Sequence, residues 1–277
     1  MVLALIASLA IVFSSGPAPL KIRLQPVPMA SISQSSGSYD PDAERQLLDL
    51  ANQARAKAGL DPLQADEGLT QAARTHAALM AEQHQLSHQF SGEPTLAQRL
   101  AADSNLHLDR SGENVAYAAT AEQAAETLMQ SPPHRENLLS PDYNTAGFGV
   151  VRSGNTLYVT QDFAHNLPKV SAQTAEETVA RKLNRSRVES GLSPLQQMDG
   201  GPAQASACSM AQANLLKVSA VKARYVLRYT SMDPATIPPG TERATQDRDV
   251  RAFSVGACYA RTATYPNGVY WVVVQFY

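Results

Sequence analysis

Two histidines and one glutamate stand out as residues that could share chemistry: His88, Glu113 and His134. Neutral imidazoles and a carboxylate are the usual ligands of a divalent transition metal such as zinc. The same side chains could perform acid–base chemistry, because histidine titrates near neutral pH and a carboxylate can tune it. A third interpretation is a hydrogen-bonded network that ties helices together without chemistry. The wide spacing matches no short metal motif such as HExxH, so all three interpretations stay open.

Other histidines and serines make weaker candidates. His84 and His88 are four residues apart, which would place both on one face of a helix. His76 falls within an apolar helical pattern, which predicts a partly buried, hydrogen-bonded histidine of the core. Ser131 precedes His134 by three residues, but the sequence contains no G-x-S-x-G motif. It also contains no glycine-rich phosphate loop, EF-hand loop or nucleotide fingerprint.

The first half of the chain mixes helical and strand patterns. Asp40 is a candidate N-cap followed by Pro41, and the apolar spacing predicts a helix over residues 41–58. Further helices are predicted over residues 68–85, 95–102 and 121–130, the last ended by two prolines. A Ser-Gly pair predicts a turn just before Glu113. Residues 145–164 alternate like a β-hairpin. The pattern therefore predicts an α+β domain over residues 41–166.

The second half repeats the first in part. Residues 52–64 and 184–196 share Asn, Arg, Gly, Leu, Pro, Leu and Gln at a constant offset. A second match pairs residues 68–73 with 201–206, and the hairpin recurs as 146–151 with 255–260 and 158–163 with 272–277. The segment that holds Glu113 and His134 has no counterpart. Residues 167–277 are therefore predicted to be a shortened tandem copy without the candidate site.

Composition and the ends of the chain limit the function further. The 277 residues carry a formal net charge of −2, so no basic surface favours nucleic acid. Residues 1–13 are apolar, which favours an export signal or weak anchor over residues 1–18, although a buried N-terminal element is an alternative. Residues 19–40 have the composition of a linker. The protein is expected to be secreted, extracellular or periplasmic, with a disulfide between Cys208 and Cys258 rather than two thiols.

Several ordered motifs resemble a known family. They are LLDLANQARAKAGLDPL, QLSH, GEN at 112–114, SPPHRENLL at 131–139 and GFGVV…YVTQDF, which together cover residues 42–165. This stretch resembles a bacterial member of the CAP superfamily, also called SCP-like, which contains cysteine-rich secretory proteins, venom antigens and plant pathogenesis-related proteins. The resemblance implies an α-β-α sandwich with a small antiparallel sheet and an open cleft, followed by a degenerate second copy.

The resemblance also implies a set of cleft residues. In the family two histidines and two glutamates converge and can hold a divalent metal, and they correspond here to His88, His134 and Glu113. The second glutamate corresponds to Ser131, and a frequent tryptophan nearby corresponds to Leu128, so this chain departs from the pattern at both positions. Asn114 of the GEN motif completes the expected cleft. Zinc is the metal that this set would favour.

Three functions remain open at this stage. The first is a secreted binding protein for a small apolar, lipid-like or peptide-like ligand or for a component of the cell envelope. The second is a metal-assisted hydrolase that uses His88, Glu113 and His134. The third is a structural or interaction protein of the envelope. The missing second carboxylate and the absence of a nucleophile motif favour a binding protein over an enzyme.

Overall fold

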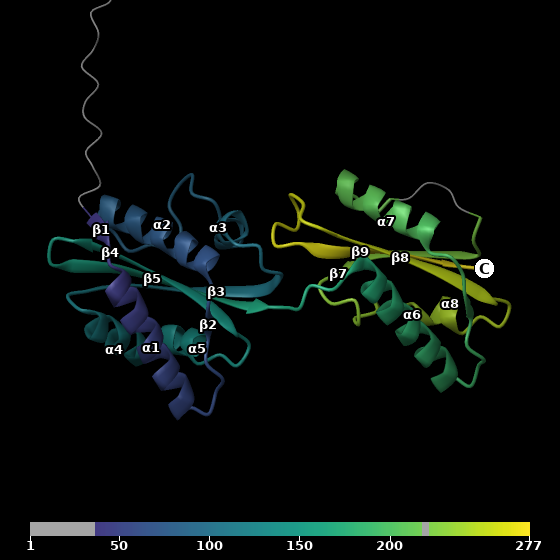
Figure 1. Ribbon diagram of the computed structural model, residues 1–277, viewed down its shortest axis with the longest axis horizontal. Helices are drawn as coiled ribbons and strands as arrows, with labels where there is room; N and C mark the ends of the chain where they lie inside the picture. The colour runs from purple at the N-terminus through teal and green to yellow at the C-terminus, as the bar shows by residue number, and fades with distance from the viewer. Residues whose placement is uncertain (1–36, 218–221) are drawn as a thin grey trace, which may run out of the picture. The chain divides into compact units, whose positions relative to one another are not determined.

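The computed structural model describes residues 37–217 and 222–277. The expected export segment and most of the expected linker lie outside these residues. No helix in the described ranges has the length and apolar composition needed to cross a membrane. Figure 1 shows the helices and strands of both halves of the chain.

The first half contains five helices and five strands among the described residues. The helices are α1 Pro41–Lys57, α2 Glu67–Gln83, α3 Leu96–Asp103, α4 Ala121–Gln130 and α5 Pro132–Leu138. The strands are β1 Gly37–Tyr39, β2 Gln64–Ala65, β3 Leu108–Ala118, β4 Thr145–Ser153 and β5 Thr156–Asn166. The sheet runs in the order β1-β4-β5-β3, and β2 pairs in parallel with the start of β4. β3 is therefore an edge strand.

Local sequence explains where the helices begin. The Asp40 carboxylate accepts a hydrogen bond from Ala43 N–H at 3.1 Å, and Asp66 accepts one from Leu69 N–H at 2.9 Å, so both are N-caps as their residue type favours. Thr120 caps α4 in the same way. Pro132 ends α4 but also begins α5, because a proline at the first helical position loses no intrahelical hydrogen bond.

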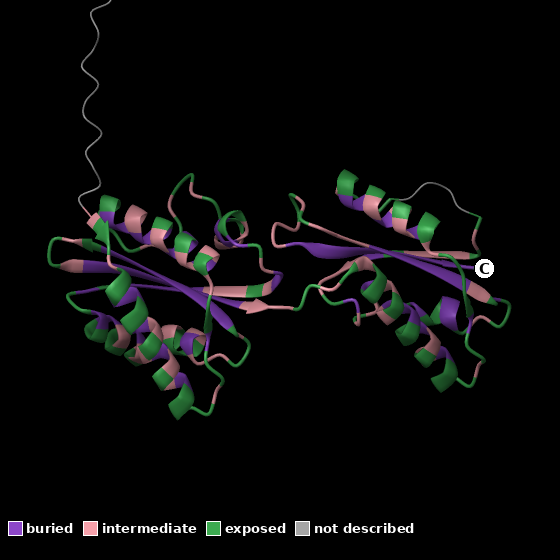
Figure 2. Ribbon diagram, viewed as in Figure 1, coloured by how far each residue is buried: buried purple, intermediate pink, exposed green. Residues whose placement is uncertain are grey.

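Helices cover both faces of the first sheet, which gives the three layers of an α+β sandwich (Figure 1). Two glycines of β4 let α2 approach closely: a Cβ atom on Gly147 would lie 2.1 Å from Leu69 C, and one on Gly149 would lie 2.2 Å from Ala73 C. On the opposite face α1, α4 and α5 pack over a core that includes Leu47 and Leu128. Buried residues follow β4 and β5 through the middle of the layers (Figure 2).

Two details differ from the sequence-based expectations. Ser111 and Gly112 lie inside β3 and not in a turn, since their backbone pairs with Ala164 and Phe163 of β5. Residues Gly37–Tyr39, expected to belong to the linker, form β1 and pair with the end of β4. A short polar strand at a sheet edge carries little hydrophobic pattern, so sequence alone does not reveal it.

The second half has a similar arrangement with fewer elements. Its helices are α6 Ala172–Glu189, α7 Gly201–Ala213 and α8 Glu242–Thr245, and its strands are β6 Gln196–Gln197, β7 Tyr225–Ser231, β8 Ala252–Ala260 and β9 Val269–Phe276. The sheet order β6-β8-β9-β7 matches the order β2-β4-β5-β3 of the first half. α6 and α7 pack against the sheet as α1 and α2 do (Figure 1).

Buried arginines make the same contacts in both halves. Arg55 donates to the carbonyl oxygens of Asp61, Leu138, Ser140 and Tyr143 at 2.8–3.0 Å. Arg187 donates to those of Ser193, Thr245, Asp247 and Val250 at 2.7–3.2 Å. Each guanidinium thus donates to four backbone carbonyl groups, which need hydrogen-bond donors where they are buried. The two halves therefore share the contacts of a buried arginine as well as their strand order.

The structural correspondence between the halves differs in register from the sequence match. Asp66 N–H donates to the carbonyl of Ala146, and Met198 N–H donates to that of Phe253, so Phe253 takes the place of Ala146. The sequence match had paired Ala146 with Val255. Left-handed residues end both α2 and α7, at His84 and Asn214. Short apolar strands resemble one another at several offsets, so only hydrogen bonding fixes their register.

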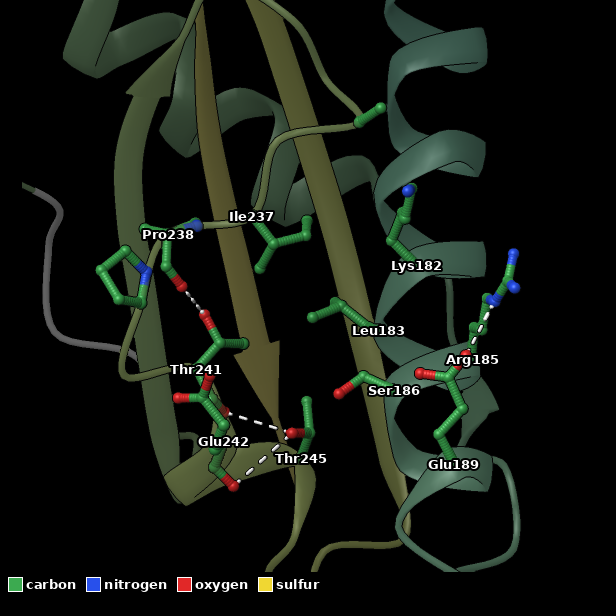
Figure 3. A pocket seen from close by; sticks show the side chains of 12 residues that line it. Lys182, Leu183, Arg185, Ser186, Glu189, Ile237, Pro238, Thr241, Glu242 and Thr245 are labelled. Atoms are coloured by element: carbon green, nitrogen blue, oxygen red, sulfur yellow. Dashed lines mark hydrogen bonds and ion pairs between the residues drawn. The ribbon is translucent and has the colours of Figure 1, made fainter.

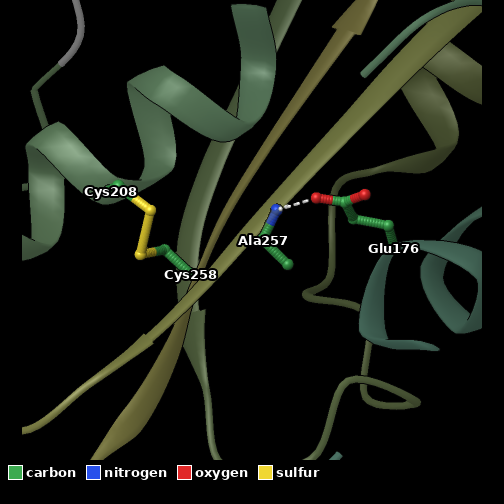
Figure 4. The surroundings of a disulfide bond; sticks show 4 residues. All are labelled: Glu176, Cys208, Ala257 and Cys258. Atoms are coloured by element: carbon green, nitrogen blue, oxygen red, sulfur yellow. Dashed lines mark hydrogen bonds between the residues drawn. A yellow bond between two sulfur atoms is a disulfide. The ribbon is translucent and has the colours of Figure 1, made fainter. Parts of the chain in front are cut away.

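The predicted disulfide is confirmed. Cys208 of α7 and Cys258 of β8 are bonded, with their Cα atoms 5.1 Å apart (Figure 4). On the other side of β8, the Glu176 carboxylate of α6 accepts a hydrogen bond from Ala257 N–H at 3.0 Å (Figure 4). The bond and the carboxylate therefore fasten the two helical layers to the same strand.

Removing this disulfide should weaken the second half selectively. We expect the double variant Cys208→Ser/Cys258→Ser to lose about 2–4 kcal/mol of unfolding free energy, because a closed loop restricts the unfolded chain. Fluorescence of the single tryptophan, buried Trp271, follows this half during urea unfolding. Reductant should lower the urea midpoint of the wild type and leave the double variant unchanged. Equal midpoints for both proteins without reductant would contradict the expectation.

Candidate functional site

Glu113 lies in β3 on the face of the sheet that α2 covers. It stands opposite Asp162 of β5, which in turn stands opposite Gly147 of β4, the glycine beneath α2. The Glu113 side chain is buried, and its two oxygens have different partners: Oε1 accepts from Nδ1 of His88 at 2.8 Å, and Oε2 accepts from the guanidinium of Arg99. The sequence-predicted pair His88 and Glu113 is thus brought together, with an unpredicted arginine.

Arg99 of α3 lies between two carboxylates. Besides Glu113, its guanidinium contacts Oε1 of Glu93 at 3.4 Å and donates to the carbonyl of Pro94 at 3.2 Å. The side chain is 5% exposed. Its Nε–H has no hydrogen-bond acceptor among the described residues. A buried guanidinium needs such carboxylates, because removing a charge from water without a partner is costly.

His76 of α2 adds an imidazole to this group. Nδ1 lies 2.7 Å from Oε1 of Glu93, and Nε2 lies 2.7 Å from the carbonyl oxygen of Ser87. A carbonyl oxygen and a carboxylate are hydrogen-bond acceptors, so each ring nitrogen has an acceptor within hydrogen-bonding distance. The prediction of a buried, hydrogen-bonded histidine is confirmed. Its membership of the Glu113 cluster was not foreseen.

Asp162 is the fully buried acid of the group. Neither of its oxygens has a hydrogen-bond donor within the described residues. Burial, followed by the negative charge of Glu113, raises the pKa of Asp162 well above its usual range. Asp162 therefore keeps its proton to a higher pH than an exposed aspartate does. The cluster thus groups the acids Glu93, Glu113 and Asp162 with the guanidinium of Arg99 and the imidazole of His76.

The remaining predicted residues lie around the edge of β3. His134 is in α5, and burial followed by the nearby His88 ring lowers its pKa, so the two imidazoles lie close enough to sense each other's charge. Asn114 follows Glu113 in the strand and points to the opposite face, where its amide donates to the carbonyl of His134 at 3.0 Å. Ser131 is the residue between α4 and α5 and is partly buried. Asn114 therefore does not share a surface with the Glu113 carboxylate.

The residues present do not fit the divalent metal that the resemblance implies. Both Glu113 oxygens are already engaged by His88 and Arg99. Within residues 37–217 and 222–277, no three His, Cys, Asp or Glu side chains are arranged to hold a metal ion. Ser131 supplies no charge where a second carboxylate would be needed, and a guanidinium next to Glu113 repels a cation. The function of this site is therefore argued without a bound metal.

A groove opens beside the charged cluster. It has a volume of about 810 Å³ and lies between α2, the loop at residues 90–94 and α3. Six of its lining residues are apolar: Ala72, Ala78, Leu79, Phe90, Pro94 and Ala102. Glu93 and Arg99 line it as well, so the groove and the buried cluster share a wall.

A second cavity lies in the other half of the chain. Its volume is about 630 Å³, and it separates α6 from the segment that leads into α8 (Figure 3). Lys182, Arg185 and Glu189 line one side, and Ile237 and Pro238 line the other (Figure 3). Arg185 and Glu189 pair with each other at 2.9 Å. This cavity combines charges of both signs with five apolar residues, Leu183, Ala235, Ile237, Pro238 and Pro239.

The family of the first half is established by comparison. The model of the cysteine-rich secretory protein family, CAP, matches residues 48–163. This part of the chain is therefore a CAP domain, as its motifs predict. The match contains Glu113 and its cluster and ends before the second half begins.

Two proteins of Bacillus subtilis (strain 168) are similar to part of the chain. YkwD is 33% identical over 115 residues, which are 40% of this chain and 44% of YkwD. The membrane protein YlbC is 36% identical over 122 residues, which are 44% of this chain and 34% of YlbC. The chain thus spans less than half the length of either relative.

Two of the similar solved structures cover about half of the chain. One is an extracellular protein with an SCP domain from Bacillus anthracis str. Ames, at 26% identity and TM-score 0.43, covering 46% of this chain and 41% of that one. Another is an outer surface protein from Borrelia burgdorferi, at 20% identity and TM-score 0.44, covering 47% of this chain and 99% of that one.

Sequence reasoning did not find Glu93, Arg99 and Asp162. Glu93 and Arg99 come from a loop and a short helix that carry no motif, and contacts formed across the fold leave no trace in local spacing. For Asp162 a signal existed: it is a lone carboxylate in YVTQDF, a strand that reads as buried on both faces. A charge inside such a strand needs a partner or a proton.

The buried Asp162 makes stability dependent on pH. Because its pKa is raised in the folded state, the folded protein keeps a proton that the unfolded chain releases, so stability falls as pH rises above the usual carboxyl range. The slope from this group reaches at most about 1.4 kcal/mol per pH unit. Asp162→Asn should remove this slope, so the unfolding free energy of the variant should gain on that of the wild type as pH rises above the usual carboxyl range.

Urea unfolding at a series of pH values measures this difference. Asp49→Asn, an exposed aspartate of α1, is the matched control and should follow the wild type. Parallel curves for Asp162→Asn and the wild type would show that Asp162 is ionised in the folded protein.

Proposed function

We propose that this CAP-domain protein is an exported binding protein whose groove beside α2 and α3 takes a small apolar or peptide-like ligand. The observation that carries the proposal is the groove, with its apolar lining and its volume of about 810 Å³. Ligand sites are typically concave, mostly apolar and supplied with a few polar groups that orient the ligand. Thr75, Glu93 and Arg99 are such groups here.

In this proposal the charged cluster is the support of the groove. The Glu93 carboxylate holds the 90–94 loop by accepting from Phe90 N–H at 3.0 Å, and Arg99 joins α3 to Glu113 of the sheet. His76 joins α2 to Glu93. All the elements that form the groove are thus tied to one another. Binding needs such a rigid frame, while catalysis would need a free reactive group that Glu113 does not offer.

Export is supported by chemistry in two parts of the chain. The apolar run over residues 1–13 has the length of a secretory signal. The bond between Cys208 and Cys258 belongs to an oxidising compartment, since thiols in the cytosol are kept reduced. A location outside the cytoplasmic membrane, either extracellular or periplasmic, follows from both.

The second half is, in this proposal, a shortened tandem copy with a structural or interaction role. The matching strand order and the matching arginines Arg55 and Arg187 support a common origin. Where the first half has Glu113 opposite Asp162, the second has Val226 opposite Gln275. The copy thus keeps the frame and lacks the acids of the cluster.

A neutral fluorescent probe tests whether the groove binds apolar molecules. N-phenyl-1-naphthylamine should bind the purified protein with enhanced emission, and Leu79→Trp should weaken binding at least tenfold by filling the groove. Gln71→Trp is the matched control, because Gln71 is exposed on α2 and does not line the groove. Equal affinities for Leu79→Trp and Gln71→Trp would refute the groove as the binding site.

A further inference from the structure

We infer that the ligand of the groove is a peptide segment in which a large apolar side chain is flanked by lysine or arginine. This inference rests on the proposed function and adds the chemical class of the ligand. Three features of the groove support it. They are the carboxylates at its rim, the Nε–H of Arg99, which has no acceptor among the described residues, and the sign of its total charge.

Two exposed carboxylates stand at the rim, Glu82 in the last turn of α2 and Asp103 in the last turn of α3. Neither forms an ion pair or side-chain hydrogen bond with another described residue. The C-terminal end of a helix carries partial negative charge, so a carboxylate there destabilises the helix and strengthens the negative potential. Both last turns lack a basic residue. A cationic group of a ligand would relieve this repulsion at both helix ends.

Arg99 provides the second feature. The side chain lines the groove, is 5% exposed, and keeps its Nε–H without an acceptor in the described part of the chain. A buried donor without a partner is costly, which makes a ligand acceptor favourable. A peptide carbonyl oxygen is a neutral acceptor of the right kind. Nε of Arg99 is closed off from solvent in this structure, so a peptide carbonyl would bond to it only after the side chain turns toward the groove. Such a bond would add no further charge to the cluster.

The balance of charge separates a peptide from a fatty acid. Glu82, Glu93 and Asp103 line the groove against a single cation, Arg99. That cation is already shared by Glu93 and Glu113. A carboxylate on the ligand would therefore be repelled, whereas lysine or arginine beside an apolar side chain would be attracted. The apolar side chain would rest against Leu79 and Phe90.

Displacement of bound N-phenyl-1-naphthylamine by three peptides tests the charge rule. The peptides are acetyl-KLFK-amide, acetyl-QLFQ-amide and acetyl-ELFE-amide, which share one apolar pair. The lysine peptide should displace the probe at a concentration at least tenfold lower than the glutamine peptide, and the glutamate peptide should be the weakest. Raising NaCl to about 1 M should remove the difference, because salt screens exposed charges.

Two pairs of substitutions locate the effect. Glu82→Gln/Asp103→Asn should abolish the preference for lysine, which is the ratio of the displacing concentrations of the three peptides measured on the same variant. Asp49→Asn/Glu126→Gln changes the same total charge on α1 and α4, away from the groove, and should keep the preference. Equal displacement by the three peptides, no displacement by any, or a preference that survives Glu82→Gln/Asp103→Asn would overturn the inference. In those cases probe binding that is sensitive to Leu79→Trp would leave the proposed function standing, and insensitive binding would remove both.

Discussion

The first half of the chain depends on a guanidinium held between two buried carboxylates. Arg99 contacts Glu93 and Glu113, and these three residues come from α3, a loop and β3. Isolated charges of this kind would be expelled to water, so each one requires the others to be in place. His76 of α2 joins the same group through Glu93. These contacts connect α2, α3, the 90–94 loop and β3, and the groove lies on the outer surface of that unit.

The close packing of α2 on the sheet does not itself require these charges. Gly147 and Gly149 bring α2 onto β4, and Gly256 brings α7 onto β8 in the same manner. In the second half Val226 and Gln275 occupy the places of Glu113 and Asp162, and a disulfide fastens the helix. The same arrangement of a helix on a sheet thus has buried charges beside it in the first half and a disulfide in the second half. Because the frame stands without the buried acids, their presence in the first half points to a demand beyond folding.

Much of the fold could be predicted from local patterns, and much of the site could not. N-caps, prolines and apolar periodicity located α1, α2 and α4, because these signals act within a few residues. The motifs placed His88 with Glu113. The partners Arg99 and Asp162 depend on tertiary contacts across 14 and 49 positions of sequence, counted from Glu113. Asn114 shows the opposite error: a neighbour in a motif is on the other face of a strand, since side chains alternate.

The same charges explain why a carboxylate-rich domain would bind a ligand and not a metal. Both oxygens of Glu113 are engaged by Arg99 and His88, so it offers no free oxygen to a cation. Within the groove, the exposed carboxylates Glu82 and Asp103 belong to the ends of two different helices. In the proposed function, negative charges at the rim of an apolar groove suit an extended ligand that carries cationic groups beside an apolar one.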